Sequence, residues 1–178
     1  MMESYRRLRH TYGFGVHSPF AYSLVTNVVR PGRRYAFYGY EDIDATFGSR
    51  VLPGVRREAR MLLRLAAFLR PREVFLPSGI HAAYHASLHA AGVREIVRRP
   101  KLADRCDMIC THGDFLPEHL LRECLSRPGS VVAIRDVPPA WAQRLFRSLG
   151  DGLMILGRRN AVLIHRTDMQ PLCYTMKI

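Results

Sequence analysis

The sequence lacks an apolar run long enough to cross a membrane, because a span needs roughly 18 to 20 such residues in succession. The amino terminus, MMESYRRLRH, carries charges without the apolar segment that would follow them in a secretory leader. Apolar residues make up 48% of the 178 positions, which is enough for one hydrophobic core. We therefore expect a soluble cytoplasmic protein with a single domain covering residues 1–178.

Cysteine is also scarce, and its spacing does not suggest bridges or metal ligation. The four cysteines show no Cys-x-x-Cys pair, and each lies among apolar neighbours. This pattern is typical of reduced, buried thiols. We expect neither a disulfide bond nor a metal site at these positions: Cys106, Cys110, Cys124 and Cys173.

Acidic residues are few relative to basic ones, and lysine is almost absent. The chain has 27 Lys and Arg against 15 Asp and Glu, a formal net charge of +12, and lysine occurs only at Lys101 and Lys177. Such an excess can neutralise phosphates, so a nucleic-acid partner is an open alternative. It is not the favoured one, because the arginines are spread along the chain in pairs and arginine-rich codon usage gives the same composition.

The first third of the chain contains helical patterns and no strand pattern. Ser18 to Val29 has an N-cap serine, proline at the first helical position and apolar residues at helical spacing. A weaker helix is expected at Asp42 to Arg50, and an amphipathic one at Arg56 to Leu69. These segments predict an N-terminal helical cap over residues 1–70.

Beyond Pro71 the pattern alternates between short apolar strands and helices, which predicts a Rossmann-like α/β domain over residues 71–178 with a mostly parallel sheet. The final segments indicate strands joined by tight turns, which we expect to add an antiparallel hairpin at one edge. Strands are expected at Glu73–Leu76, Glu95–Arg98, Asp107–Thr111 and Ser130–Arg135, and helices at Ile80–Ala91, Phe115–Ser126 and Pro139–Leu149.

The segment Gly15-Val16-His17-Ser18-Pro19-Phe20 resembles the opening motif of a bacterial family of class I S-adenosylmethionine-dependent methyltransferases. The order of the later segments, including CDMICTHGDF, VVAIRDV and GLMILGRRNAVLIHR, is similar to that family over nearly the whole chain. The chain is shorter than is usual in the family between Val97 and Cys106. The resemblance implies a class I methyltransferase fold, S-adenosylmethionine as cofactor and an unknown small molecule as methyl acceptor.

The resemblance also implies where the site residues lie. In an open parallel sheet, ligands bind beyond the carboxyl ends of the strands. By the resemblance, Ser78, Gly79 and His112 are the candidate cofactor contacts, and His17 is a candidate substrate contact. His112, Asp114 and Asp136 are the catalytic candidates near the methyl group. They also allow a second hypothesis, in which an Asp-oriented His112 acts as a general base.

Several positions depart from the family pattern. Leu76 stands in place of an acidic residue, and Pro77 lacks a backbone donor where the family has glycine. Arg98 stands where an acid accepts hydrogen bonds from the ribose, although arginine has no acceptor. His112 replaces an expected aspartate, and Arg135 replaces the acidic neighbour of Asp136. We therefore predict degenerate or lost cofactor binding, the alternative function being a non-catalytic scaffold for a protein or nucleic-acid partner.

Histidines elsewhere have competing interpretations. His81, His85 and His89 recur at helical spacing, which allows HxxxH metal pairs, but no nearby carboxylate or cysteine completes a ligand set. We favour the interpretation that these three histidines form a solvent-exposed stripe along the helix. His17 either lines a substrate pocket or fixes the start of the helix at Ser18, and the second role is favoured. A homodimer, formed through the hairpin edge or the cap, is left open.

Overall fold

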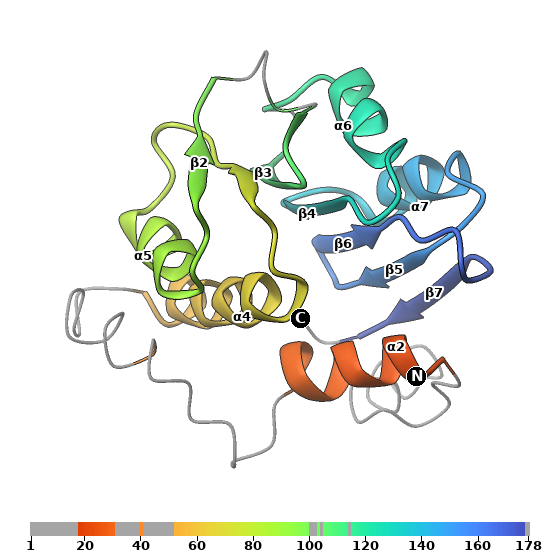
Figure 1. Cartoon of the computed structure of the whole chain (residues 1–178), viewed down its shortest axis with the longest axis horizontal. Coiled ribbons are helices and arrows are strands. Elements are labelled where there is room, and N and C mark those ends of the chain that lie inside the picture. The colour runs from red at the N-terminus through yellow and green to blue at the C-terminus, as the bar shows by residue number, and fades with distance from the viewer. Residues whose placement is uncertain are drawn as a thin grey trace.

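The computed structural model describes residues 18–30, 40, 52–99, 103, 105–113 and 115–176. Within these residues the chain forms a central sheet with helices on both faces (Figure 1). The helices α2 (Pro19–Leu24), α4 (Pro53–Leu69) and α5 (Ala82–Ala90) lie on one side of the sheet, and α6 (Glu118–Leu125) and α7 (Pro139–Arg147) lie on the other (Figure 1). The predicted α/β class is confirmed. The weak helix expected at Asp42 to Arg50 lies outside the described residues.

The helix expected at Ser18 to Val29 is present as α2, Pro19–Leu24, which continues into a π-helical turn, η1, Val25–Val29. Ser18 caps it, because its hydroxyl accepts a hydrogen bond from Ala21 N at 3.3 Å. The next helix, α4, covers Pro53–Leu69 and so begins three residues before the predicted start at Arg56. Pro53 occupies the first helical position, where the missing amide hydrogen costs nothing.

The described residues form a seven-stranded sheet in the order β2-β1-β3-β4-β6-β5-β7. All its neighbouring pairs are parallel except β4–β6 and β5–β6. The strands are β1 Glu73–Phe75, β2 Glu95–Val97, β3 Met108–His112, β4 Val131–Arg135, β5 Leu153–Leu156, β6 Asn160–Ile164 and β7 Leu172–Thr175. The helices between the parallel strands are α5 Ala82–Ala90, α6 Glu118–Leu125 and α7 Pro139–Arg147.

The expected antiparallel hairpin is β5–β6, and it is confirmed. β6 pairs with β4 as well as with β5, and the last strand, β7, runs parallel to β5 at the edge. Gly152, at the start of the hairpin, has φ +116°, and a Cβ there would lie 2.2 Å from the carbonyl oxygen of Ile164. Only glycine therefore allows the chain to enter β5 so close to the end of β6.

Two apolar cores fill the spaces between the sheet and its helices. On one side, α2, α4 and α5 bury residues such as Leu24, Leu62 and Leu88 against the sheet. On the other, α6 and α7 bury residues such as Leu121 and Phe146. Fully burying a leucine or phenylalanine side chain stabilises the fold by about 1.5–3 kcal/mol. The helices of the expected cap thus pack directly on the sheet.

None of the helices within the described residues is long and apolar enough to cross a lipid bilayer.

Candidate functional site

The strand order places one crevice at the centre of the sheet. From β1 the chain moves outward to β2, then returns to pair β3 with the opposite side of β1. This reversal between β1 and β3 is a topological switch point, where the loops after the two strands separate. In open α/β sheets such a point, at the carboxyl ends of the strands, is the usual ligand site.

The loop after β1 has the expected strand–turn–helix shape. Gly79 has φ +85°, and the His81 ring caps α5, since its Nδ1 accepts a hydrogen bond from Ala83 N at 3.1 Å. Ser78 and Gly79, the predicted cofactor contacts, are both exposed. Leu76 is only 1% exposed and Pro77 is also buried, so the position of the expected acid is part of the core.

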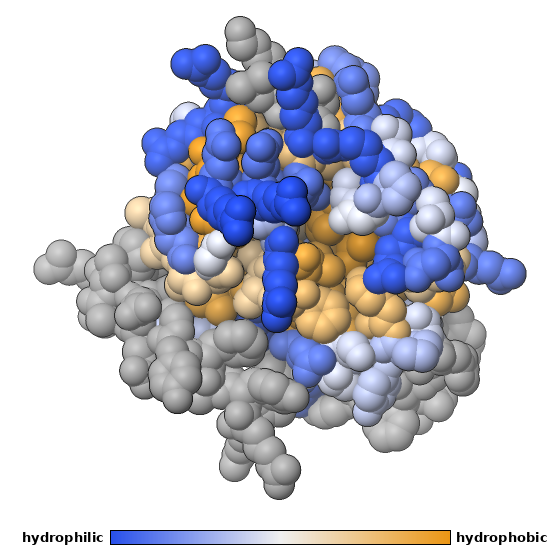
Figure 2. Space-filling model, viewed as in Figure 1, coloured by the Kyte–Doolittle hydropathy of each residue, from blue (hydrophilic) through white to orange (hydrophobic). Residues whose placement is uncertain are grey.

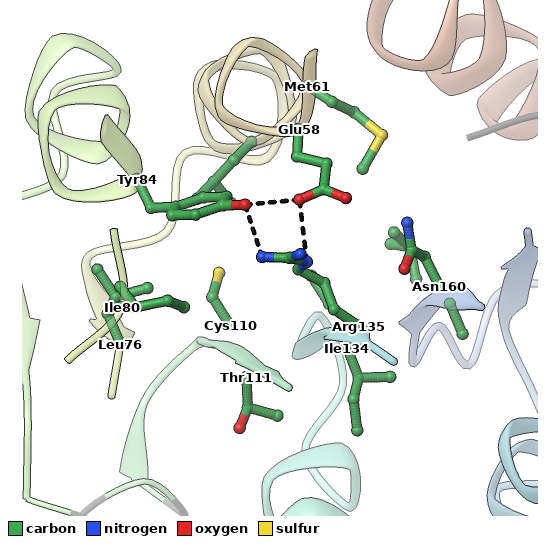
Figure 3. Close-up of a pocket in the computed structure, with 14 residues that line it drawn as sticks. Glu58, Met61, Leu76, Ile80, Tyr84, Cys110, Thr111, Ile134, Arg135 and Asn160 are labelled. Carbon is green, nitrogen blue, oxygen red and sulfur yellow. Dashed lines mark hydrogen bonds and ion pairs between the residues drawn. The ribbon is translucent and has the colours of Figure 1, made fainter. Parts of the chain in front are cut away.

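Three polar side chains meet above this crevice. Glu58 extends from α4, Tyr84 from α5 and Arg135 from the carboxyl end of β4 (Figure 3). The Tyr84 hydroxyl donates a hydrogen bond to Glu58 Oε2 at 2.5 Å. Arg135 Nη1 donates to the Tyr84 hydroxyl at 2.6 Å. Arg135 Nε lies 2.9 Å from Glu58 Oε2, an ion pair without hydrogen-bond geometry. We call these three residues the Glu58–Tyr84–Arg135 triad.

The electrostatics of the triad keep its tyrosine protonated. Burial raises the pKa of Tyr84 strongly, and Glu58 raises it further through the hydrogen bond it accepts and through its charge. The charge of Arg135 opposes these effects but is the smaller influence. Tyr84 is therefore a hydrogen-bond donor at neutral pH and not a base. The Arg135 guanidinium also lies over the Tyr84 ring, 5.4 Å from its centroid.

The triad borders a small cavity of about 50 Å³. Apart from the triad, Thr111 and Asn160, the lining is apolar: Met61, Leu62, Leu76, Ile80, Cys110, Ala133, Ile134, Ala161 and Val162. Pockets for small ligands and cofactors are usually about 300–1,000 Å³. A cavity of this size holds one or two water molecules and not a nucleoside.

Two of the predicted catalytic residues lie at neighbouring strand ends. His112 ends β3, is exposed and pairs in register with Arg135 on β4. Asp136, with φ +55°, follows β4, and its carboxylate is 3.5 Å from Arg159 Nη2 and 3.9 Å from Arg135 Nη2. Among the described residues, no hydrogen bond or ion pair joins His112 to Asp136. The predicted Asp114 and His17 lie outside the described residues.

The histidines of α5 contact one another and an arginine. His85 Nε2 accepts a hydrogen bond from Arg98 Nη2 at 2.7 Å, and the His85 and His89 rings are 5.2 Å apart. Burial lowers the pKa of His85, and the charges of Arg98 and His89 lower it further. Within the described part of the chain, no three His, Cys, Asp or Glu side chains are grouped as metal ligands.

The three buried cysteines carry little reactivity at neutral pH. All four are free, and Cys106, Cys110 and Cys124 are buried. Burial raises the pKa of Cys106 to about 12 and that of Cys124 to about 11, and it raises that of Cys110 as well. The thiolate is the reactive form, so these side chains act as small apolar residues of the core.

Sequence reasoning missed two members of the triad. Tyr84 is 3% exposed, so its ring belongs to the apolar face of its helix, but its hydroxyl reaches the crevice. Glu58 is the single acid within the arginine-rich stretch RREAR, and this isolation is the only signal in the sequence. No protein-family profile matches this chain, and no curated protein matches its sequence.

Proposed function

We propose that this chain is a methyltransferase-like α/β domain that has lost S-adenosylmethionine binding and serves as a non-catalytic binding module. The observation that carries the proposal is the Glu58–Tyr84–Arg135 triad, which occupies the crevice at the switch point and leaves only about 50 Å³ beside it. A nucleoside cofactor would have to separate two hydrogen bonds and an ion pair before it could enter there.

The two neighbouring strand ends support the same proposal. Leu76, at the end of β1, is buried in the apolar core, so its side chain offers nothing polar to a ligand. At the end of β2, Arg98 donates to His85, and a guanidinium cannot accept a hydrogen bond from ribose hydroxyls. Neither Leu76 after β1 nor Arg98 after β2 therefore offers a side-chain acceptor to the cofactor.

The competing function is methyl transfer from S-adenosylmethionine to a small acceptor by His112, Asp114 and Asp136. One observation favours it, because His112 is exposed at the carboxyl end of β3. Against it, the Asp136 carboxylate faces Arg159 and Arg135 rather than His112.

Titration calorimetry of the full chain with S-adenosylmethionine and S-adenosylhomocysteine separates the two functions. We expect no saturable heat at millimolar ligand and no shift of the melting temperature. A ligand at about one hundred times its Kd stabilises a protein by roughly 2.7 kcal/mol. For a chain of this size that is a shift of roughly 5–10 °C.

Adenosine serves as the control for non-specific binding in this titration, since it shares the base and ribose but lacks the amino-acid arm. A saturable one-site isotherm with S-adenosylhomocysteine, accompanied by a thermal shift that adenosine does not produce, would contradict the proposal.

A further inference from the structure

The carboxyl edge of the sheet carries arginines at both of its ends. Arg98 and Arg99 follow β2 and are exposed. Arg158 and Arg159 precede β6, which runs antiparallel to β4, so they lie at the same edge. A backbone hydrogen bond of 3.0 Å from Val137 N to Arg159 O joins this segment to the loop after β4. We call these four arginines, with His112 and Phe115 between them, the arginine rim.

Most of the positive charge of the rim is not neutralised. Among the described residues, Arg98, Arg99 and Arg158 form no ion pair with a carboxylate. Arg98 is held instead by the neutral acceptor of His85, at 2.7 Å. Arg159 pairs with Asp136 at 3.5 Å, but its side chain is 71% exposed, and exposed pairs of this kind are weak. The rim is therefore a positive surface that retains its affinity for anions.

The opposite edge of the sheet carries arginines as well, but acids lie among them. Arg72 and Arg94 precede β1 and β2, but Glu73 and Glu95 follow them directly and pair in register. Asp107 lies at the same edge, and its carboxylate accepts a hydrogen bond from Arg72 N at 2.8 Å. Acids thus lie among the arginines at the amino edge, which also include Arg70 and Arg127, whereas the arginines at the carboxyl edge stand in pairs. Figure 2 shows hydrophilic side chains gathered over the part of the molecule where β2 and β3 lie.

The length of the rim exceeds what one phosphate group needs. Strands β2, β1, β3, β4 and β6 are neighbours in that order. At a strand spacing of about 4.8 Å, the two arginine pairs are roughly 19 Å apart. An extended chain of several phosphates spans such a distance, and a single small anion does not.

An exposed aromatic pair lies between the two arginine pairs. Phe115 is 38% exposed, and its ring centroid is 5.6 Å from that of His112 at the end of β3. Behind it, the Phe75 ring is 6.3 Å away in the core and supports it. Proteins that bind single-stranded nucleic acid combine a positive groove with such rings, on which the bases stack.

We propose that the arginine rim binds single-stranded nucleic acid, with backbone phosphates on the Arg98/Arg99 and Arg158/Arg159 pairs and a base stacked on Phe115. This assignment rests on the proposed function, because it names the partner of a domain whose crevice holds no cofactor. Contact with four phosphates predicts a logarithmic salt slope of about −3 for a single strand.

Fluorescence anisotropy of a labelled twelve-nucleotide single strand, titrated with the full chain between low and moderate salt, tests the proposal. Two double variants remove one pair each, R98A/R99A and R158A/R159A. Each should weaken binding at low salt by roughly tenfold and make the salt slope shallower by about 1.4. The matched control is R144A/R147A, which removes two exposed arginines of α7 and should bind as the wild type does.

Stacking is tested separately by Phe115→Ala, which should weaken binding by roughly fivefold or more while the salt slope stays unchanged. The matched control is Tyr22→Ala, at an aromatic residue 51% exposed on α2. Circular dichroism and thermal melts show that each variant is folded before it is compared. A His112→Ala variant provides a second test of the aromatic pair where Phe115→Ala is unstable.

Several results would overturn the proposal. One is the absence of any anisotropy change at low salt, and another is an equal loss of oligonucleotide affinity in R144A/R147A and in the rim variants. A third is binding of polyglutamate as tight as that of the oligonucleotide, which would indicate an acidic protein partner. Failure of the rim is distinguishable from failure of the proposed function. If S-adenosylhomocysteine binds saturably and the oligonucleotide still binds, only the proposed loss of the cofactor site is overturned. If neither ligand binds, only the proposed nucleic-acid binding by the arginine rim is overturned.

Discussion

Arg135 and Arg98 both stand at the carboxyl end of a parallel strand, yet their surroundings are opposite. Arg135 reaches back over the sheet to Glu58, whose carboxylate neutralises its charge, and to the Tyr84 hydroxyl, which accepts its hydrogen bond. Arg98 remains at the surface, where it donates a hydrogen bond to the ring of His85. The first arginine is therefore engaged inside the crevice, whereas the second leaves a positive charge available at the edge of the sheet.

The sharpest test of this comparison is to truncate each arginine. Arg135→Ala should lower the free energy of unfolding by about 2 kcal/mol, because Glu58 and Tyr84 lose a partner in a half-buried site. The Arg135 and Glu58 side chains are only 32% and 24% exposed. Urea denaturation measures the change. Arg98→Ala is the matched control and should alter the stability by no more than about 0.5 kcal/mol. Equal losses in the two variants would remove the distinction between them.

A second prediction concerns stability at alkaline pH. The pKa of Tyr84 is raised in the folded state, so the folded chain keeps a proton that the unfolded chain releases above about pH 10. The contribution of this protonated tyrosine to the free energy of unfolding is fully present below about pH 10. It is lost as the pH rises above that value, by up to about 1.4 kcal/mol per pH unit. Tyr84→Phe should therefore make the alkaline decline of stability shallower, as measured by urea denaturation across the pH range.

Tyr22→Phe, at an exposed position on α2, is the control for this series and should keep the wild-type slope. The buried cysteines, whose pKa values are also raised, contribute equally to all three proteins and cancel from the comparison. An unchanged slope in Tyr84→Phe would show that the tyrosine is not held neutral by its surroundings.

The smallest predicted effect is on His85. Burial is the main cause of its lowered pKa, and the charge of Arg98 is the next. Arg98→Ala should therefore raise the His85 pKa, which a histidine-resolved NMR titration measures. Arg135→Ala should leave it unchanged, because Arg135 is engaged with Glu58 and Tyr84. A rise of the His85 pKa in both variants, or in neither, would contradict the different surroundings assigned to the two arginines.

Much of the fold was predictable from the sequence, because strand and helix patterns are local. The predicted strands at Glu73–Leu76 and Ser130–Arg135 agree with β1 and β4 to within one residue at either end. Ser18 and Pro19 mark the start of α2 by the chemistry of a single cap. The parallel direction of β7 was not predictable. A short connection after β6 suggests that the next strand pairs antiparallel with β6, but β7 instead pairs with the free edge of β5.

The triad was not predictable, because it joins three elements that are distant in sequence. Tyr84 is 26 residues from Glu58 and 51 from Arg135. The pattern identified Arg135 as a basic residue in an acidic position, but it did not indicate a partner. The partner lies on α4, which sequence reasoning assigned to a cap rather than to the layer that covers the crevice. Only the packing of α4 and α5 on the same sheet face brings the three side chains together.

Saturation-transfer NMR with S-adenosylhomocysteine and the full chain examines the loss of cofactor binding itself, because it detects ligands that bind with millimolar affinity. The proposed loss of cofactor binding predicts no transfer to the ligand protons in the wild type, with adenosine as the reference. Transfer to both the adenine and the homocysteine protons in the wild type, lost in Gly79→Val at the turn after β1, would show that the cofactor site is intact and that the account is wrong.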